Sequence, residues 1–156
     1  MNKEDYMHIA LNLAKEAASK DEVPVGAIII NPQTAEIIST AYNQSAHTGD
    51  ATDHAEIIAI KKACKILQSN RLWNLDMYVT LEPCTMCTAA ISFARIRNVY
   101  FGAYDEKGGA IENGVKFYTS QTCHHKPHTE GGILQEECSA ILKDFFQNKR
   151  QKKIPT

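Results

Sequence analysis

The chain has 156 residues, a length that suits one compact domain and leaves little room for a second. Hydrophobic residues make up 44% of it and charged residues 22%, and these fractions exclude a disordered or low-complexity chain. Lys and Arg number 17 against 18 Asp and Glu, which gives a formal charge of -1. That balance excludes a generic basic coat for nucleic acid, so any nucleic-acid contact must be local.

The sequence pattern shows no targeting or membrane-spanning segment. Residues 1–5, Met-Asn-Lys-Glu-Asp, lack the apolar stretch of a secretory signal. The uncharged stretch over residues 23–35 is interrupted by prolines and is too short to cross a bilayer. We therefore expect a cytoplasmic protein that has no membrane partner.

The apolar spacing predicts helices that alternate with strands. In chain order, we expect a helix over 6–17, strands over 26–30 and 36–42, a helix over 54–67, a strand over 77–81, a helix over 84–94, a strand over 99–103 and a helix over 134–145. Residues 43–53 are predicted as loop, and residues 105–132 as loop with short elements. This order indicates an α/β layer with a mostly buried sheet. One domain is predicted over residues 1–150, followed by a charged, disordered tail over 151–156.

Two short motifs carry chemistry, and each opens a predicted helix. One is His54-Ala-Glu56, and the other is Pro83-Cys84-Thr-Met-Cys87. The positive end of a helix lowers thiolate pKa values and so prepares cysteines to bind a cation. Two cysteines and one histidine suit Zn²⁺, and three protein ligands leave the fourth tetrahedral position open, as in catalytic sites. Glu56 is close enough to reach a water there without binding the metal.

Each motif alone has a simpler interpretation. A Cys-x-x-Cys pair can be redox-active or can fill a core beside a helix, and a lone His-x-Glu carries almost no information. The chain has an odd total of five cysteines, and in a cytosolic chain the spacing of Cys84 and Cys87 favours metal or redox chemistry over structural disulfides. The two motifs together, in this order and before helices, are specific to a zinc site.

The paired motifs resemble the H-x-E and P-C-x-x-C signature of zinc-dependent nucleoside and nucleobase deaminases. Within that superfamily the chain is similar to the bacterial tRNA-specific adenosine deaminases over nearly its whole length. The matching blocks cover residues 21–27, 43, 54–57, 78–87, 101–105 and 137–146. The resemblance implies a three-layer α/β/α cytidine-deaminase-like fold around a mixed, five-stranded sheet. It also implies a homodimer with one Zn²⁺ in each subunit.

The same resemblance implies a reaction and the residues that carry it. His54, Cys84 and Cys87 hold the zinc, and Glu56 moves protons while adenosine is hydrolysed to inosine and ammonia. The implied partner is the anticodon stem-loop of a tRNA, modified at its wobble adenosine, with arginine tRNA as the expected substrate. Loop bases suit such an enzyme because they are unpaired and enter a pocket at modest cost.

Five further residues are implied to contact the substrate. Asn43 resembles a residue that hydrogen-bonds the target nucleoside, although Asn is equally common in a turn that ends a strand. The backbone N–H of Ala55 is expected at the edge of the base. Asp105 is expected beside the flanking nucleotide, with a solvated loop acid as the alternative. Phe145 and Phe146 resemble a pair near the anticodon, one packed and one available for stacking, or else belong to the core or a dimer interface.

Two features stand outside this assignment. Asp53 takes the place of the alanine that commonly precedes the zinc histidine in the family, and it adds a negative charge near the site. The segment Cys123-His124-His125-Lys-Pro-His128 looks like a second metal cluster, but adjacent histidines point in different directions. We interpret it as a loop that approaches RNA phosphates or caps the structure.

Two other functions share most of these residues. A free nucleobase or nucleoside deaminase, for guanine or cytosine, has every zinc residue in common. Only the 101–105 block and the C-terminal helix with its phenylalanine pair favour the tRNA enzymes. A zinc-stabilised RNA-binding module without turnover has no need of an acid at Glu56, so the intact acid argues against it.

Overall fold

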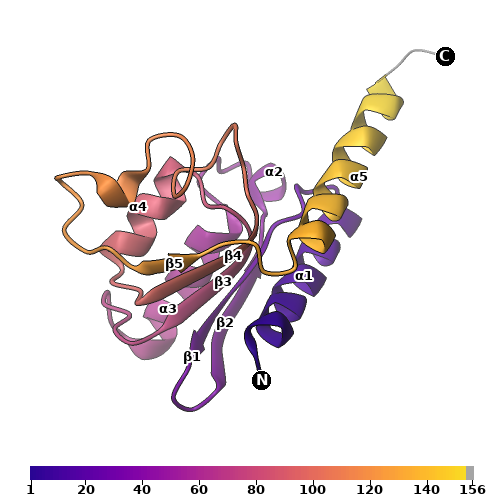
Figure 1. Cartoon of the computed structure of the whole chain (residues 1–156). Helices are drawn as coiled ribbons and strands as arrows, with labels where there is room; N and C mark the ends of the chain where they lie inside the picture. The colour runs from indigo at the N-terminus through magenta and orange to yellow at the C-terminus, as the bar shows by residue number, and fades with distance from the viewer. Residues whose placement is uncertain (154–156) are drawn as a thin grey trace.

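The computed structural model describes residues 1–153 as helices packed around one five-stranded sheet (Figure 1). The helices are α1 (Lys3–Ser19), α2 (Ser45–Thr48), α3 (Ala55–Leu67), α4 (Thr85–Phe93), the 3-10 turn η1 (Phe117–Thr119) and α5 (Gln135–Lys153). The strands are β1 (Gly26–Asn31), β2 (Glu36–Tyr42), β3 (Asp76–Leu81), β4 (Asn98–Ala103) and β5 (His128–Glu130). Within residues 1–153, no helix is both long and apolar enough to cross a membrane.

The sheet has the strand order β2-β1-β3-β4-β5 and is mixed. Strand β1 runs antiparallel to β2 and β3, whereas β3, β4 and β5 run parallel to one another. Ile29 of β1 pairs with Met77 of β3, which in turn pairs with Val99 of β4. All three side chains are fully buried, as expected for strands covered on both faces. The predicted mixed, five-stranded sheet is confirmed.

Helices cover both faces of the sheet and so form three layers (Figure 1). Helices α1 and α5 lie on one face, where Met7 and Cys138 share a buried cluster with Ile28. Helices α3 and α4 lie on the other face, where Ala59 shares a second cluster with Ile29. Since successive side chains of a strand point to opposite faces, β1 is apolar over residues 26–30, and only Asn31 at its end is polar. The predicted α/β/α architecture is confirmed.

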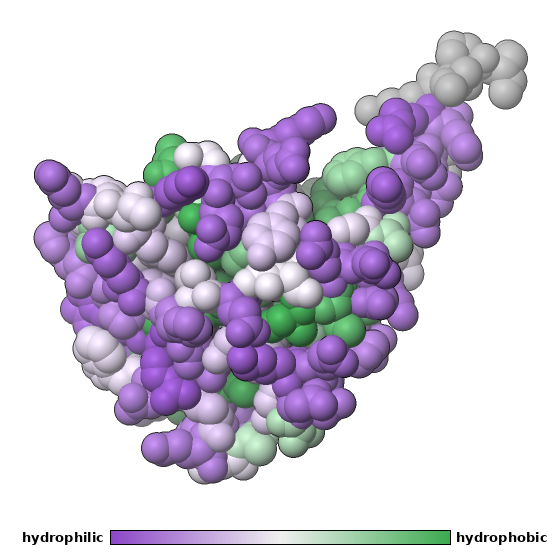
Figure 2. Space-filling model, in the orientation of Figure 1, coloured by the Kyte–Doolittle hydropathy of each residue, from purple (hydrophilic) through white to green (hydrophobic). Residues whose placement is uncertain are grey.

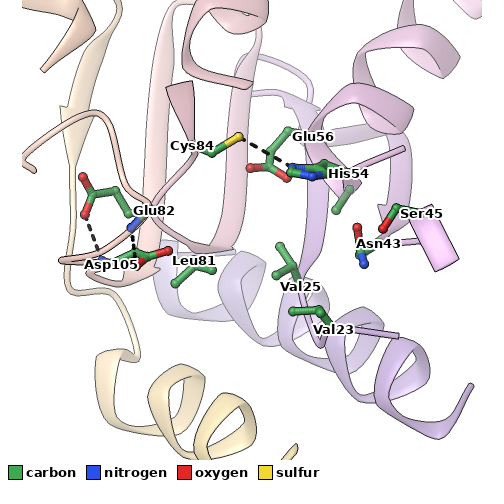
Figure 3. Close-up of a pocket in the computed structure, with 12 residues that line it drawn as sticks. Val23, Val25, Asn43, Ser45, His54, Glu56, Leu81, Glu82, Cys84 and Asp105 are labelled. Atoms are coloured by element: carbon green, nitrogen blue, oxygen red, sulfur yellow. Dashed lines mark hydrogen bonds between the residues drawn. The ribbon is translucent and has the colours of Figure 1, made fainter. Parts of the chain in front are cut away.

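The helices differ in whether a side chain caps their first turn. Helix α1 begins three residues earlier than the apolar spacing predicts because Asn2 and Asp5 form a capping box, with both hydrogen bonds at 2.8 Å. Helices α3 and α4 are preceded by His54 and Cys84, and neither of these side chains caps its helix. Both side chains instead point to the cavity described below (Figure 3).

Two helices differ from the sequence prediction. Helix α2 lies within the predicted 43–53 loop and is too short to carry a recognisable repeat. Strand β5 and the turn η1 are short elements within residues 105–132, as predicted for that segment. Helix α5 continues to Lys153, so residues 151–153 are helical, and the predicted disordered tail is wrong at these positions. Residues 154–156 lie outside the described residues.

Gly26 allows α1 to cross β1 at close range. A Cβ atom at this position would lie 2.0 Å from the carbonyl oxygen of Ala10 and 2.8 Å from the backbone nitrogen of Ala14. No larger residue fits between the helix and the strand without moving one of them. The segment just before β1 carries Val23 and Val25 to the cavity.

Candidate active site

The N-terminal ends of α3 and α4 meet beside a cavity of about 230 Å³ (Figure 3). Helix α4 directly follows β3, and α3 follows the loop after β2, so the fold brings His54 and Cys84 together across 30 positions of sequence. Val25 and Leu81 line the cavity with apolar surface. Apolar walls with a few convergent polar groups are typical of a small-molecule site.

Three side chains at the cavity form a set of metal-type donors. The Nδ1 atom of His54 lies 3.6 Å from Sγ of Cys84 and 3.6 Å from Sγ of Cys87. Two such ligands on a tetrahedral Zn²⁺, at bond lengths of about 2.0–2.1 Å and 2.3 Å, are separated by about 3.5–3.6 Å. The donor set therefore fits zinc in both atom type and spacing. Among residues 1–153, it is the one group of three or more such side chains that lies within metal-binding distance.

The pKa values of these three side chains are shifted by their mutual hydrogen bonds and by burial. The hydrogen bond with Cys87 lowers the pKa of Cys84 to about 4, so Cys84 is a thiolate at neutral pH. The same hydrogen bond, together with burial, raises the pKa of Cys87. The hydrogen bond with Cys84 raises the pKa of His54. Metal binding here would release protons, because a cation replaces them on the sulfur and the imidazole.

Glu56 lies in the first turn of α3 beside His54 and Cys84 (Figure 3). It is 4% exposed, and burial raises its pKa to about 7. A carboxyl group with a pKa near neutrality can both accept a proton and return it, which is the task of a general acid–base catalyst. Glu56 therefore stands where the sequence places it, next to the metal-type donors and outside their set.

Asn43 lies at one wall of the cavity and is buried. Its Nδ2 atom donates to Oε1 of Glu22 at 3.4 Å. Glu22, which is 2% exposed, also accepts hydrogen bonds from the backbone of Ala46 at 3.1 Å and His47 at 2.7 Å. One buried carboxylate thus holds both the candidate substrate-binding amide and the start of α2.

Ala55 and Asp105 also lie at the cavity. Ala55 is the first residue of α3, where backbone N–H groups have no partner within the helix. Asp105 is half-buried, and its Oδ1 atom accepts hydrogen bonds from the backbone of Lys107 at 3.1 Å and Gly108 at 2.9 Å. Asp105 is therefore an ordered turn residue at the cavity.

Phe145 and Phe146 lie on α5 near the cavity, with ring centroids 5.4 Å apart. Phe145 is half-buried, and Phe146 is 44% exposed. Phe146 lines two surface grooves, one of which shares Asp105 with the cavity while the other shares Asn43. Phe146 is thus the ring available for stacking, and Phe145 is the more covered partner.

The sequence analysis did not identify two buried acidic side chains at or beside the cavity. Glu82 is 2% exposed, and its carboxylate accepts hydrogen bonds from the backbone of Asp105, Ile111, Glu112 and Asn113 and from the side chain of Asn113. Although burial acts in the opposite direction, the hydrogen bonds lower the pKa of Glu82. Glu22, which holds Asn43 but does not itself line the cavity, is the second such acid. A usable signal was present for Glu82, which lies within the strongly apolar block over residues 77–84, where a charged residue requires partners.

The features outside the predicted site have structural partners. The His125 ring contacts the carbonyl oxygen of Ile96 at 2.7 Å, and the Ser92 hydroxyl donates to the carbonyl oxygen of His125 at 2.6 Å. These contacts hold the loop against the end of α4 and the residues that follow it. Asp53 accepts a hydrogen bond from the Thr48 hydroxyl at 2.7 Å and so braces the loop before His54.

Comparisons with known proteins agree with this geometry. Residues 1–103 match the family described as the cytidine and deoxycytidylate deaminase zinc-binding region. A tRNA-specific adenosine deaminase from Agrobacterium fabrum is 48% identical over 145 residues, which cover 93% of this chain and 94% of the relative. One from Bacillus subtilis is 39% identical over 148 residues, which cover 95% of this chain and 91% of the relative.

Solved structures share the fold. One, from work on A-to-I editing by tRNA:A34 deaminases at the wobble position of transfer RNA, superimposes with a TM-score of 0.87 at 47% identity, over 90% of this chain and 100% of that chain. A guanine deaminase from Nitrosomonas europaea superimposes with a TM-score of 0.81 over 92% of this chain and 84% of that chain, at 18% identity, and is similar in fold alone. The chain therefore has a cytidine-deaminase-like fold with a zinc-binding region and belongs to the tRNA-specific adenosine deaminase family of hydrolytic deaminases.

Proposed function

We propose that this chain hydrolyses adenosine to inosine at the wobble position of a tRNA, with arginine tRNA as the expected substrate. The observation that carries the proposal is the position of the buried acid Glu56 beside the donor set of His54, Cys84 and Cys87, at a cavity large enough for a base. The names of the relatives support a tRNA substrate, and the study of tRNA:A34 deaminases supports the wobble position.

The metal is held by His54 through Nδ1 and by the sulfur atoms of Cys84 and Cys87. The spacing of these atoms supports this assignment, since it fits tetrahedral zinc. When bound, Zn²⁺ supplies Lewis-acid chemistry that lowers the pKa of water. Three protein ligands leave one coordination position for a small molecule.

Glu56 moves the protons in this proposal. Its carboxylate takes one proton from the attacking water and delivers it to N1 of adenine as the C6–O bond forms. It then carries the second proton of that oxygen to the exocyclic amine, so that the C6–N bond breaks and ammonia leaves. Water and adenosine are consumed, and inosine and ammonia are produced. A pKa of about 7 supports the role, because both protonation states are then populated at neutral pH.

Five residues are proposed to hold the substrate. Asn43 hydrogen-bonds the target nucleoside, and the backbone N–H of Ala55 lies at the edge of the base. Asp105 contacts the flanking nucleotide. Phe146, packed against Phe145, stacks on a neighbouring base, a contact worth ~1–3 kcal/mol. The grooves on which Phe146 lies support this assignment, because each of them adjoins the cavity.

The surface near these grooves supports an RNA partner more than a free base. Lys143, Lys149 and Arg150 of α5 line the grooves together with the phenylalanines. Figure 2 shows that the far half of α5, which projects from the body of the molecule, carries mainly hydrophilic side chains. Lys149 pairs with Asp21 at 2.7 Å, whereas the side chains of Lys143 and Arg150 can contact phosphates even though the formal charge of the chain is -1. We further propose that the protein acts in the cytoplasm as a homodimer.

The test is a site-resolved editing assay with the zinc-loaded protein. An unmodified arginine tRNA whose anticodon begins with A is incubated with the protein, and inosine is read as G after reverse transcription. We expect conversion at the wobble position alone. Zinc-loaded protein that leaves this adenosine unchanged, while it releases ammonia from free guanine or cytosine, would assign the free-base activity instead.

A further inference from the structure

We propose that Glu82 is a positioning residue for this reaction, because its carboxylate holds the segment over residues 105–113 as one wall of the cavity. The inference rests on the proposed function and extends it to a residue that lines the cavity but lies outside the set of metal-type donors. Asp105 and Gly108 of this segment line the cavity, so the shape of that wall depends on how the segment is held (Figure 3).

The carboxylate of Glu82 is almost fully enclosed by hydrogen-bond donors of this segment. Oε1 accepts from the backbone of Asp105 at 3.0 Å and from Nδ2 of Asn113 at 2.7 Å. Oε2 accepts from the backbone of Ile111 at 3.1 Å, Glu112 at 2.8 Å and Asn113 at 3.2 Å. All five donors are amides, so the buried negative charge is stabilised by N–H dipoles of the wall itself.

The segment is held by turn and loop hydrogen bonds instead of a helix or strand, and Asp105 accepts those of Lys107 and Gly108. The segment lies between the end of β4 at Ala103 and the turn η1 at Phe117, outside any helix or strand. Backbone N–H groups without a helix or sheet need another acceptor when they are buried, and Glu82 supplies one for four residues. The carboxylate therefore takes the place of regular secondary structure in this wall.

Close packing shows that the segment is fitted to the carboxylate. A Cβ atom at Gly109 would lie 2.4 Å from Cδ of Glu82 and 2.6 Å from the carbonyl oxygen of Asp105. The backbone N–H of Ala110 also donates to the carbonyl oxygen of Pro83 at 2.9 Å. Pro83 directly precedes Cys84, so the substrate wall and the metal-type donors are joined through one short, rigid turn.

Glu82→Gln is the direct test, since it keeps the size of the side chain and replaces one acceptor oxygen with an NH₂ group. That group cannot accept the backbone N–H groups that face it, so the wall loosens. We expect the KM for an anticodon hairpin to rise about tenfold or more, while kcat stays within about threefold and zinc content is unchanged. Glu36→Gln, the same change at an exposed acid of β2, is the matched control and should alter neither constant.

Two further measurements separate positioning from a general loss of structure. In an Asp105→Ala background, Glu82→Gln should raise KM by a much smaller factor than it does in the native chain, because both changes disturb the same wall. Hydrogen exchange without substrate should show faster exchange at residues 111–113, with unchanged protection in β1 and β3. If Glu82→Gln does not fold, Asn113→Ala removes one of the donors and should raise KM about threefold by the same route.

The outcomes distinguish this inference from the proposed function. A native chain that edits no tRNA overturns the proposed function, whereas exchange at residues 111–113 still tests the anchoring role of Glu82. A native chain that edits, together with a Glu82→Gln variant whose KM equals that of Glu36→Gln, overturns the inference. The inference is also overturned if Glu82→Gln raises KM by the same factor with and without Asp105→Ala. It is overturned as well if Glu82→Gln lowers kcat and leaves KM unchanged.

Discussion

The side-chain amide of Asn43 donates a hydrogen bond to Glu22 at 3.4 Å, and both residues are buried beside the cavity. Glu82 and Asp105 lie across the cavity from Asn43 (Figure 3). Each wall is therefore held in part by a buried carboxylate that accepts hydrogen bonds from backbone N–H groups. Glu22 accepts those of the first turn of α2, and Glu82 accepts those of the segment over residues 105–113.

Glu22→Gln should destabilise the fold. The change replaces an acceptor oxygen that receives the backbone N–H groups of Ala46 and His47, and unsatisfied buried donors cost about 1–3 kcal/mol. Denaturant unfolding followed by circular dichroism measures the free energy of unfolding. Glu16→Gln, the same change at an exposed acid paired with Lys20, should cost less than about 0.5 kcal/mol. Equal costs for the two variants would contradict the anchoring role of Glu22.

Glu56→Gln should retain zinc and lose activity. The amide has nearly the same size as the carboxyl but cannot move protons, so the rate should fall by ~10²–10⁴, the usual contribution of general acid–base catalysis. Single-turnover editing gives the rate, and metal analysis gives the zinc content. Full activity with bound zinc would rule out Glu56 as the proton carrier.

Cys87→Ser should lose zinc together with deaminase activity. The hydroxyl group is a much poorer zinc ligand than a thiolate, and Cys87 is fully buried at the donor set. Metal analysis after gel filtration should give about one zinc per chain for the native protein and far less for the variant. Cys64→Ser, at a half-buried cysteine of α3 outside the donor set, is the control and should keep its zinc. Retention of zinc by Cys87→Ser would remove this residue from the proposed ligands.

Phe146→Ala should weaken tRNA binding without destabilising the protein. Loss of one base stacked on the exposed ring corresponds to ~1–3 kcal/mol, or roughly a 5- to 150-fold rise in KM. Phe145→Ala should instead lower the free energy of unfolding, because Phe145 is half-buried and its ring lies 5.5 Å from Nζ of Lys149. KM and thermal unfolding measured on both variants would show this division. An unchanged KM for Phe146→Ala would exclude stacking on this ring.

Gly26→Ala should lower stability more than Gly49→Ala. The new methyl group at Gly26 would overlap the backbone of α1, whereas nothing lies within 4 Å of the position of a Cβ at Gly49. An alanine at Gly49 would cost only the strain of holding a φ of +70°, about 1–2 kcal/mol. Overpacking at Gly26 should exceed that cost, because helix and strand must separate. Equal free energies of unfolding for the two variants would contradict the close approach of α1 to β1.

Most of the fold was predictable from local pattern. Strand β2 spans Glu36–Tyr42 as predicted, and β1 extends one residue beyond its predicted end. Continuous β-branched runs identify buried strands, and the apolar spacing of α3 identifies an amphipathic helix. The positions of His54 and Cys84 were also predictable, because each stands immediately before a helix that its apolar spacing identifies.

The walls of the cavity were not predictable in the same way. Glu82 acts on donors 23 to 31 positions away, and Glu22 acts on donors 21 to 25 positions away. Such contacts leave no periodic signal, and neither does a strand as short as β5. The position of Glu82 within an apolar block is a hint of its contacts, whereas Glu22 follows polar residues and gives no such hint. The length of α5 was underestimated because its last turns are polar and carry no apolar spacing.

The central claim is that the zinc-loaded chain deaminates adenosine within a tRNA anticodon loop. Ammonia release measured side by side from an anticodon stem-loop that begins with A, from the same stem-loop with G in that place, and from free adenosine, guanine and cytosine tests it most directly. We predict release from the first substrate alone, and none from that substrate with Glu56→Gln. Release from a free base, with none from the stem-loop, would contradict the claim.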